Sequence, residues 1–252
     1  MLRTLNRSSL IGAAVILTAL ALAGCGSSDE DNSGAGSPGG NADDGGTVAT
    51  NDYKIADPVR QITVTGFGGD VTLSAGDGPI GVSETIRYTD DKPRTSHTVK
   101  GGVATLKADP CQHVRQVNGS CVVDWDIHAP AGTAVNLTSS SGDISVTGFA
   151  GPVFAKASAG DIEGRELTSK VVNATSNSGD VKLVFLQPPD QANAITSAGD
   201  VSIGVPPGTN YAVDAHSSTD RPNVAVPNAP NSPHKLKAST SSGAVDVTIG
   251  DN

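Results

Sequence analysis

The sequence predicts an all-β protein built as a β-solenoid, a β-helix-like stack of strand-turn-strand units of about 20 residues each. A short unit of a small residue, Gly, Asp and a β-branched residue recurs, with successive Asp residues 18, 19 and 20 positions apart. Each copy is flanked by segments of four to six residues in which apolar and polar side chains alternate, which is the pattern of half-buried strands. No segment after residue 25 shows a helical period. The copies are Ser141-Gly142-Asp143-Ile144, Ala159-Gly160-Asp161-Ile162, Ser178-Gly179-Asp180-Val181 and Ala198-Gly199-Asp200-Val201.

Residues 1–24 have the composition of a lipoprotein signal peptide. Arg3 and Arg7 precede a short apolar run, which ends in Leu22-Ala23-Gly24-Cys25. This run is too short and wrongly flanked for a lasting membrane span. Leu-Ala-Gly-Cys resembles the lipobox of bacterial lipoproteins, and this resemblance implies that Cys25 is lipidated and becomes the first mature residue. The alternative is a plain secretory signal followed by an incidental cysteine.

Residues 25–52 are expected to form a flexible tether behind the lipid. Gly, Ser, Asp and Asn dominate this segment, so it has too little apolar surface to offset the entropy of ordering. The formal net charge of the chain is −9, which argues against nucleic acid and against direct docking on anionic lipid. The expected location is the extracytoplasmic face of a bacterial cell membrane, with the lipid as the membrane contact.

Residues 53–133 are expected to form an irregular β lead-in, or cap, that continues into the repeats. Gly69-Asp70-Val71 looks like a first copy of the unit, 73 residues before Asp143. Further strands are expected at 81–89, 98–107 and 121–127, with Gly101-Gly102 as a hairpin turn. Terminal units of such stacks are usually atypical because their outer face meets water.

Two cysteines remain after Cys25, and in an exported chain Cys111 and Cys121 are most simply a disulfide. This bond would brace the excursion from residue 109 to 120. A metal site formed by Cys111, His113, Cys121 and His128 is the alternative, although its spacing is irregular.

Residues 134–252 are expected to form the repeat region proper. At each corner, Gly adopts a backbone geometry closed to other residues, and the Asp side chain is expected to tie down its own corner. A worn copy at Ser218-Thr219-Asp220 and a last one at Ser242-Gly243-Ala244-Val245 follow along the chain. An antiparallel β-sandwich is the alternative fold, because its strands have similar spacing.

These features together resemble the adhesin-like β-strand repeat proteins of unknown function found in bacteria. The resemblance covers residues 62–249 and includes Ala129-Pro130-Ala131-Gly132-Thr133, the four intact units and Val205-Pro206-Pro207-Gly208. It implies a β-repeat surface domain without catalytic residues to transfer.

In a regular stack the four corner carboxylates would lie one above another. Such a row is costly unless it is hydrogen-bonded, solvated or bridged by a cation, so calcium is the one cofactor to weigh against a purely structural role. The expected function is a non-enzymatic binding or scaffold module whose partner is an envelope protein or glycan. The alternatives are a calcium-stabilised adhesin and a glycan-active enzyme using Arg165 and Lys182. The corner carboxylates are Asp143, Asp161, Asp180 and Asp200.

Overall fold

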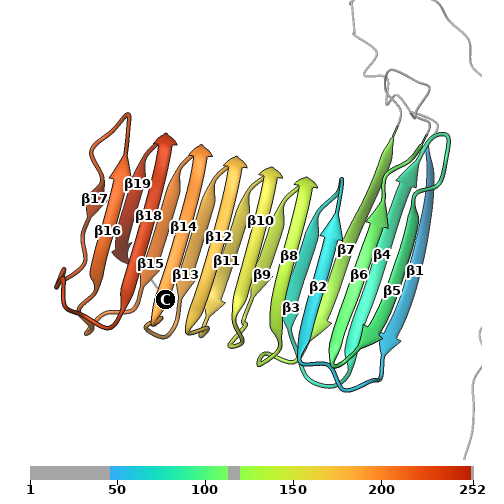
Figure 1. Cartoon of the computed structure of the whole chain (residues 1–252), viewed down its shortest axis with the longest axis horizontal. Helices are drawn as coiled ribbons and strands as arrows, with labels where there is room; N and C mark the ends of the chain where they lie inside the picture. Colours follow the sequence, from blue (N-terminus) through green and yellow to red (C-terminus); the bar gives the residue numbers. More distant parts are fainter. Residues whose placement is uncertain (1–45, 113–119, 251–252) are drawn as a thin grey trace, which may run out of the picture. The chain divides into compact units, whose positions relative to one another are not determined.

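The computed structural model describes residues 46–112 and 120–250, and these ranges form nineteen β-strands in two sheets (Figure 1). They contain no helix, and so none long and apolar enough to cross a membrane. The ten-stranded sheet has the order β1 (Thr47–Ile55), β4 (Ile80–Tyr88), β7 (Cys121–Ala129), β3 (Val71–Ala75), β9 (Ile144–Thr147), β11 (Ile162–Leu167), β13 (Val181–Phe185), β15 (Val201–Val205), β19 (Val245–Ile249), β17 (Asn223–Val224). The nine-stranded sheet has the order β16 (Ala212–Ser217), β18 (Lys235–Ser242), β14 (Gln191–Ala198), β12 (Val171–Ser178), β10 (Val153–Ala159), β8 (Ala134–Ser141), β2 (Gln61–Gly66), β6 (Val103–Asp109), β5 (Arg94–Lys100).

The predicted solenoid architecture is confirmed. Each rung of the stack consists of one strand from each sheet. In five rungs, β10–β11 and β12–β13 among them, the two strands are joined at a Gly-Asp corner. Neighbouring rungs pair in parallel with equivalent residues in register, so Ile162 lies opposite both Ile144 and Val181. Parallel in-register pairing is what a repeated sequence favours, because every rung then repeats the contacts of the one before it.

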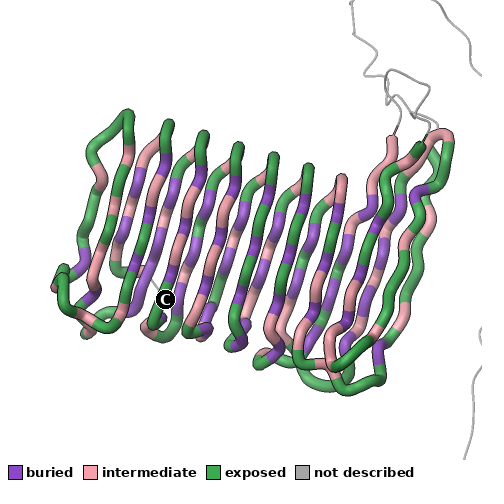
Figure 2. Tube along the Cα trace, in the orientation of Figure 1, coloured by how far each residue is buried: buried purple, intermediate pink, exposed green. Residues whose placement is uncertain are grey.

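The core is the space between the two sheets. Along most strands buried positions alternate with more exposed ones (Figure 2), because successive side chains point to opposite faces of a sheet. In β12, for example, Val172 and Ala174 are buried while Asn173 between them faces outward. Trp125, whose direction the alternation in the sequence left open, points inward and is 1% exposed. The core is thin and made largely of Val, Ile, Leu and Ala, in keeping with the scarcity of aromatic residues.

The order of rungs in space differs from their order in the sequence. The β2–β3 rung, which carries Gly69-Asp70, lies between the β6–β7 rung and the β8–β9 rung. At the other end the last copy, at Gly243, lies directly beside the β14–β15 rung. The worn copy at Asp220 belongs to the outermost rung, β16–β17. The lead-in over 53–133 is therefore less irregular than expected, because two of its rungs join the parallel stack.

The cap consists of β1, β4 and β5, which pair antiparallel with their neighbours. β1 begins at Thr47, so the end of the expected 25–52 tether is a strand. Its register runs from Thr47 opposite Tyr88 to Ile55 opposite Ile80. β1 is an edge strand, and an edge strand gains much of its stability from backbone pairing. Its side chains can therefore be polar, so its composition resembles that of a linker. The 1–24 signal peptide, Cys25 and the rest of the tether lie outside the described residues.

A buried carboxylate joins the three cap strands. Glu84 of β4 is 2% exposed and accepts hydrogen bonds from the Tyr53 hydroxyl at 2.8 Å, Thr95 Oγ1 at 2.7 Å and Asn51 Nδ2 at 3.1 Å. The Tyr53 ring also stacks on His97, with ring centroids 4.3 Å apart. Burial, followed by the hydrogen bond to Glu84, raises the pKa of the Tyr53 phenol well above its ordinary value.

Candidate functional site

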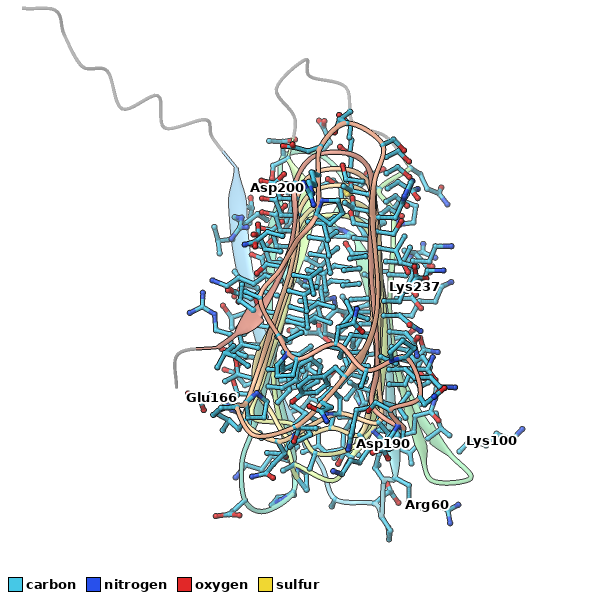
Figure 3. All side chains as sticks on the ribbon, turned by 90° about the vertical axis from the view of Figure 1, so that its left-hand side faces the viewer. Arg60, Lys100, Glu166, Asp190, Asp200 and Lys237 are labelled. Atoms are coloured by element: carbon cyan, nitrogen blue, oxygen red, sulfur yellow. A yellow bond between two sulfur atoms is a disulfide. The ribbon has the colours of Figure 1, made fainter. Side chains whose placement is uncertain are left out.

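The corners of the stack bring the predicted Asp residues together along one edge, where Asp200 is labelled in Figure 3. The glycine at each of these corners has a positive φ, from 110° at Gly142 to 135° at Gly199. A Cβ at Gly160, Gly179 or Gly199 would also collide with the carbonyl oxygen of the neighbouring rung's glycine. Conformation and close approach therefore both require glycine at these corners.

The Asp side chains form a hydrogen-bonded ladder along this edge. Asp143 Oδ1 accepts the backbone N–H of Asp161 at 2.8 Å. Asp161 Oδ1 accepts that of Asp180, and Asp180 Oδ1 that of Asp200, each at 2.7 Å. The expectation that each Asp ties down its own corner is therefore wrong, because each carboxylate holds the corner of the next rung. The backbone of one corner approaches its neighbour closely enough to place the next N–H within reach.

The ladder extends beyond the four predicted residues at both ends. Asp70 Oδ1 accepts the N–H of Asp143 at 2.9 Å, and Asp124 Oδ1 accepts that of Asp70 at 3.0 Å. Asp124 also forms a 2.6 Å ion pair with Arg87. At the far end Asp200 Oδ1 accepts the N–H of Ala244 at 2.7 Å.

A second ladder of buried hydroxyls runs inside the same corners. Thr196 Oγ1 donates to the carbonyl of Gly179 at 2.8 Å, and Thr240 Oγ1 donates to that of Gly199 at 2.9 Å. Ser176 Oγ makes the equivalent bond to Gly160 at 3.0 Å. These hydroxyl residues are not among the predicted site residues, although a Ser or Thr three positions before the corner glycine is a pattern visible in the sequence.

The predicted disulfide between Cys111 and Cys121 is present, with Cα atoms 6.1 Å apart. It lies where the β6–β7 rung passes from one sheet to the other, in the place of a Gly-Asp corner. The alternative metal site is wrong, because both of its cysteines are bonded to each other; His113 lies outside the described residues. No group of three or more His, Cys, Asp or Glu side chains suited to a metal ion occurs in the described ranges.

The basic residues weighed for a glycan-active enzyme lie on the outer face of the ten-stranded sheet. Arg165 pairs with Glu163 at 2.7 Å, and Lys182 Nζ lies 4.0 Å from the same carboxylate. The hydrogen bond from Arg165 to Glu163 raises the pKa of the guanidinium. The two exposed cations both contact the partly exposed Glu163 carboxylate, which is the ordinary arrangement of a solvated sheet surface.

The outer face of the nine-stranded sheet differs from this in charge. Most of its outward side chains are uncharged Thr, Asn, Gln or Ser, arranged in rows across the strands. One such row places Asn136, Phe154, Asn173 and Asn193 side by side, and Asn193 Nδ2 bonds Asn173 Oδ1 at 2.5 Å. The carboxylates on this face are Asp109 and Asp214. Its cations are Arg94, Lys100, Lys107, Lys156, Lys235 and Lys237.

The opposite outer face is acidic in comparison. Its cations are Lys54, Arg87, Arg165 and Lys182. Its carboxylates outnumber them and are Asp52, Asp124, Asp126, Glu163, Glu166 and Asp246. The outer face of the nine-stranded sheet is thus net positive, whereas the opposite face is net negative.

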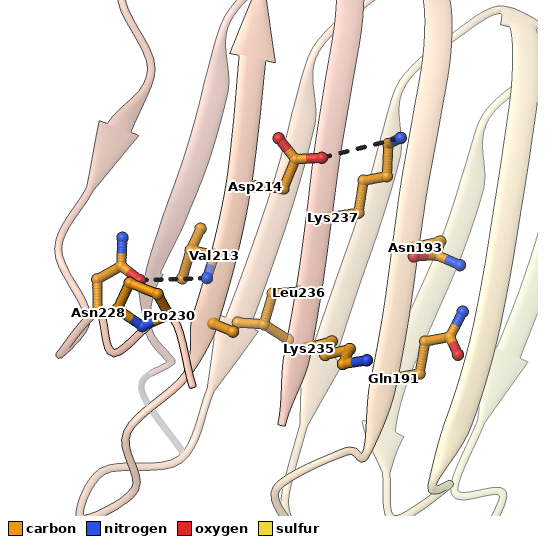
Figure 4. Close-up of a pocket in the computed structure, with 10 residues that line it drawn as sticks. Gln191, Asn193, Val213, Asp214, Asn228, Pro230, Lys235, Leu236 and Lys237 are labelled. Atoms are coloured by element: carbon orange, nitrogen blue, oxygen red, sulfur yellow. Dashed lines mark hydrogen bonds and ion pairs between the residues drawn. The ribbon is translucent and has the colours of Figure 1, made fainter. Parts of the chain in front are cut away.

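A groove of about 570 Å³ hollows the basic face at its β16 end (Figure 4). The groove is lined by Lys235 and Lys237 of β18 and by Gln191 and Asn193 of β14. Asn228 and Pro230 line it from the loop between β17 and β18. Asn228 Oδ1 accepts the N–H of Val213 at 3.3 Å and so fixes the loop against β16. Lys237 lies 3.8 Å from Asp214. The common face of these lysines could not be predicted from the sequence, because it depends on which rungs are neighbours in space.

Comparisons with known proteins agree with this architecture. Residues 60–250 match the profile of the family described as Toastrack DUF4097. Among solved structures, a candidate cell adhesion protein from Clostridium sporogenes ATCC 15579 is 11% identical, with a TM-score of 0.51 over 81% of this chain and 100% of that chain. A candidate adhesin from Bacteroides fragilis NCTC 9343 is 17% identical, with a TM-score of 0.44 over 81% and 97%. The first of these similarities shows a shared fold. No curated protein matches the chain significantly.

Proposed function

Because this chain belongs to the Toastrack DUF4097 family, we propose that it is a non-enzymatic binding module of the bacterial cell envelope. In this proposal the stack is a scaffold and the outer face of the nine-stranded sheet is the binding surface. A structure of the same fold is described as a candidate cell adhesion protein, which is in keeping with such a role.

One observation carries the proposal. The corner carboxylates are the most regular chemical groups of the repeat. Each accepts a hydrogen bond from a backbone N–H of the next rung. The repeat therefore serves to build a broad face rather than a site of clustered acids. The groove and the basic lysines lie on that face, away from the corners.

The proposed anchor is a lipid on Cys25, followed by a tether that reaches to about β1. Two or three acyl chains hold a protein far more firmly than a single chain does. Cell fractionation tests this part: wild type should be found with the membrane on the extracytoplasmic face, and Cys25→Ala should be released. Equal membrane retention of the variant would exclude lipidation at this position as the anchor.

Site-specific photo-cross-linking on intact cells tests the binding surface. Phe154 is 45% exposed at the centre of the basic face, and a photoreactive phenylalanine analogue there changes its shape little. The matched control is the same analogue at Thr147, on the outer face of the ten-stranded sheet. We expect covalent adducts with envelope components at position 154 and few at 147. Adducts at neither position, or equally at both, would refute a specific role for this face.

Calcium is not needed in this proposal. Each ladder carboxylate already accepts a backbone N–H through Oδ1, which satisfies part of its charge. Thermal melting with and without millimolar calcium chloride separates the two readings. The calcium-stabilised adhesin requires a clear rise in Tm, whereas a structural ladder predicts none.

A further inference from the structure

The basic face has the charge and the surface chemistry of a site for an extended polyanion. It carries six cationic side chains and two carboxylates, although the whole chain has a net charge of −9. Among the described residues, Lys156 and Lys235 have no carboxylate within ion-pair distance of Nζ, so their charge is available to a ligand. A surface with a net positive charge on an acidic protein attracts anions selectively, because the rest of the surface repels them.

The uncharged residues of the face favour a hydroxylated ligand over a protein partner. The cores of protein interfaces are enriched in aromatic residues and depleted in lysine. Here most residues in the rows across the strands are Thr, Asn, Gln or Ser, which donate and accept hydrogen bonds. Phe154 provides an exposed aromatic platform, flanked in register by Asn136 and Asn173.

The geometry of the lysines fits a linear chain lying across the strands. Lys235 and Lys237 are two residues apart on β18, about 7 Å along the strand. Lys156 on β10 is three strands away, or about 14 Å at the usual strand spacing. The groove at β18 lies at one end of this path (Figure 4). Phe154 lies on β10 in the same row across the strands as Lys237.

We propose that the basic face binds a linear anionic polysaccharide bearing carboxylates, with Lys156, Lys235 and Lys237 as its charged contacts. The proposal rests on the binding function proposed above and names its ligand class. An anionic lipid surface is the competing occupant. The polysaccharide is favoured because the face has one exposed aromatic residue and no apolar segment to enter a bilayer, whereas its amide and hydroxyl rows match sugar hydroxyls.

The test measures binding of the full-length protein, in neutral detergent micelles, to polygalacturonate. The uncharged matched ligand is the fully methyl-esterified polymer. The face variant is K156Q/K235Q/K237Q, and the control variant K54Q/K92Q/K182Q removes the same total charge from elsewhere on the surface. A third variant, K156R/K235R/K237R, keeps the charge on the face. Thermal melting of each variant checks that it is folded.

We expect the wild type and the arginine variant to bind polygalacturonate and not its methyl ester. Affinity should fall by roughly tenfold or more in the face variant, and by less than about threefold in the control. Equal losses in both glutamine variants, or no binding by wild type, would overturn the proposal. So would a face variant that loses binding to phosphatidylglycerol vesicles while it retains polygalacturonate, since the occupant would then be lipid. If cross-linking at Phe154 succeeds while polygalacturonate fails to bind, the ligand class is wrong and the binding function stands.

Discussion

Replacing Asp161 by alanine is the most direct test of the carboxylate ladder. Asp161 is in the middle of the row: its Oδ1 accepts the N–H of Asp180 at 2.7 Å, and its own N–H donates to Asp143 at 2.8 Å. Asp161→Ala removes the first bond and leaves the second intact. The change therefore affects one step of the ladder.

The expected loss in the free energy of unfolding follows from two opposing effects. A hydrogen bond to a charged acceptor contributes about 2.5 kcal/mol. Its removal also relieves repulsion from the two neighbouring carboxylates, which lie one strand spacing away and in water at physiological salt repel by about 1 kcal/mol in total. Asp161→Ala should therefore lower the free energy of unfolding by about 1.5 kcal/mol. Asp161→Asn, which keeps an acceptor oxygen and removes the charge, should change it by less than about 0.5 kcal/mol.

Two measurements check this result. Urea unfolding gives the total, and hydrogen exchange at the Asp180 amide reports the bond itself, even if the stack unfolds in parts. The control is Asp246→Ala on an outer strand face, whose carboxylate bonds Asn223 Nδ2 at 2.9 Å and takes no part in the corners. The ladder interpretation fails if Asp161→Ala resembles the control, or if the Asp180 amide exchanges no faster than in wild type.

Three further perturbations test the corner glycines, the disulfide and the cap. Gly179→Ala should lower the urea midpoint strongly, because its φ is 133° and its Cβ would collide with the Gly160 carbonyl; Gly81→Ala, which has open space, is the control. Reduction of Cys111–Cys121 should cost about 2–3 kcal/mol, seen as a fall in Tm with reductant that the double serine variant does not show. Because the folded-state pKa of Tyr53 is raised, its contribution is complete below its unfolded value of 10.0 and is lost as pH rises above it. Tyr53→Phe should therefore lose less stability than wild type between neutral and strongly alkaline pH, and an identical loss in both would contradict this.

The corners and their flanking strands were predictable because each rung must meet the same local constraints. Gly160 has to accommodate the Gly142 carbonyl, so glycine recurs there. Residues such as Val172 and Ala174 must face the thin core, so apolar residues alternate with polar ones. These are short-range requirements, and each leaves a pattern within about ten residues of the chain.

The order of the rungs could not be predicted in the same way. Parallel pairing between similar rungs has nearly the same local geometry whichever copies are neighbours, so the repeated unit does not specify its partner. Gly69-Asp70 stacks against Gly142-Asp143 although β3 to β8 intervene in the sequence. The basic face depends on the same long-range pairing, since Lys237 reaches the row of Asn193 only through β18 beside β14.

The spatial order explains which corners carry a carboxylate. A ladder Asp stabilises the stack only when the next rung in space presents a backbone N–H to its carboxylate. The presence of Asp at a corner therefore depends on the backbone of the following corner and not on that of its own. Ala244 is the test case, because beyond it lies the worn rung, where the Asp220 N–H is bonded to Ser217 Oγ at 3.0 Å. The Gly243 N–H is met instead by Thr219 Oγ1 at 3.1 Å. A carboxylate at position 244 would therefore have no backbone N–H to accept from the next rung. This explains why alanine can occupy the last position of the ladder.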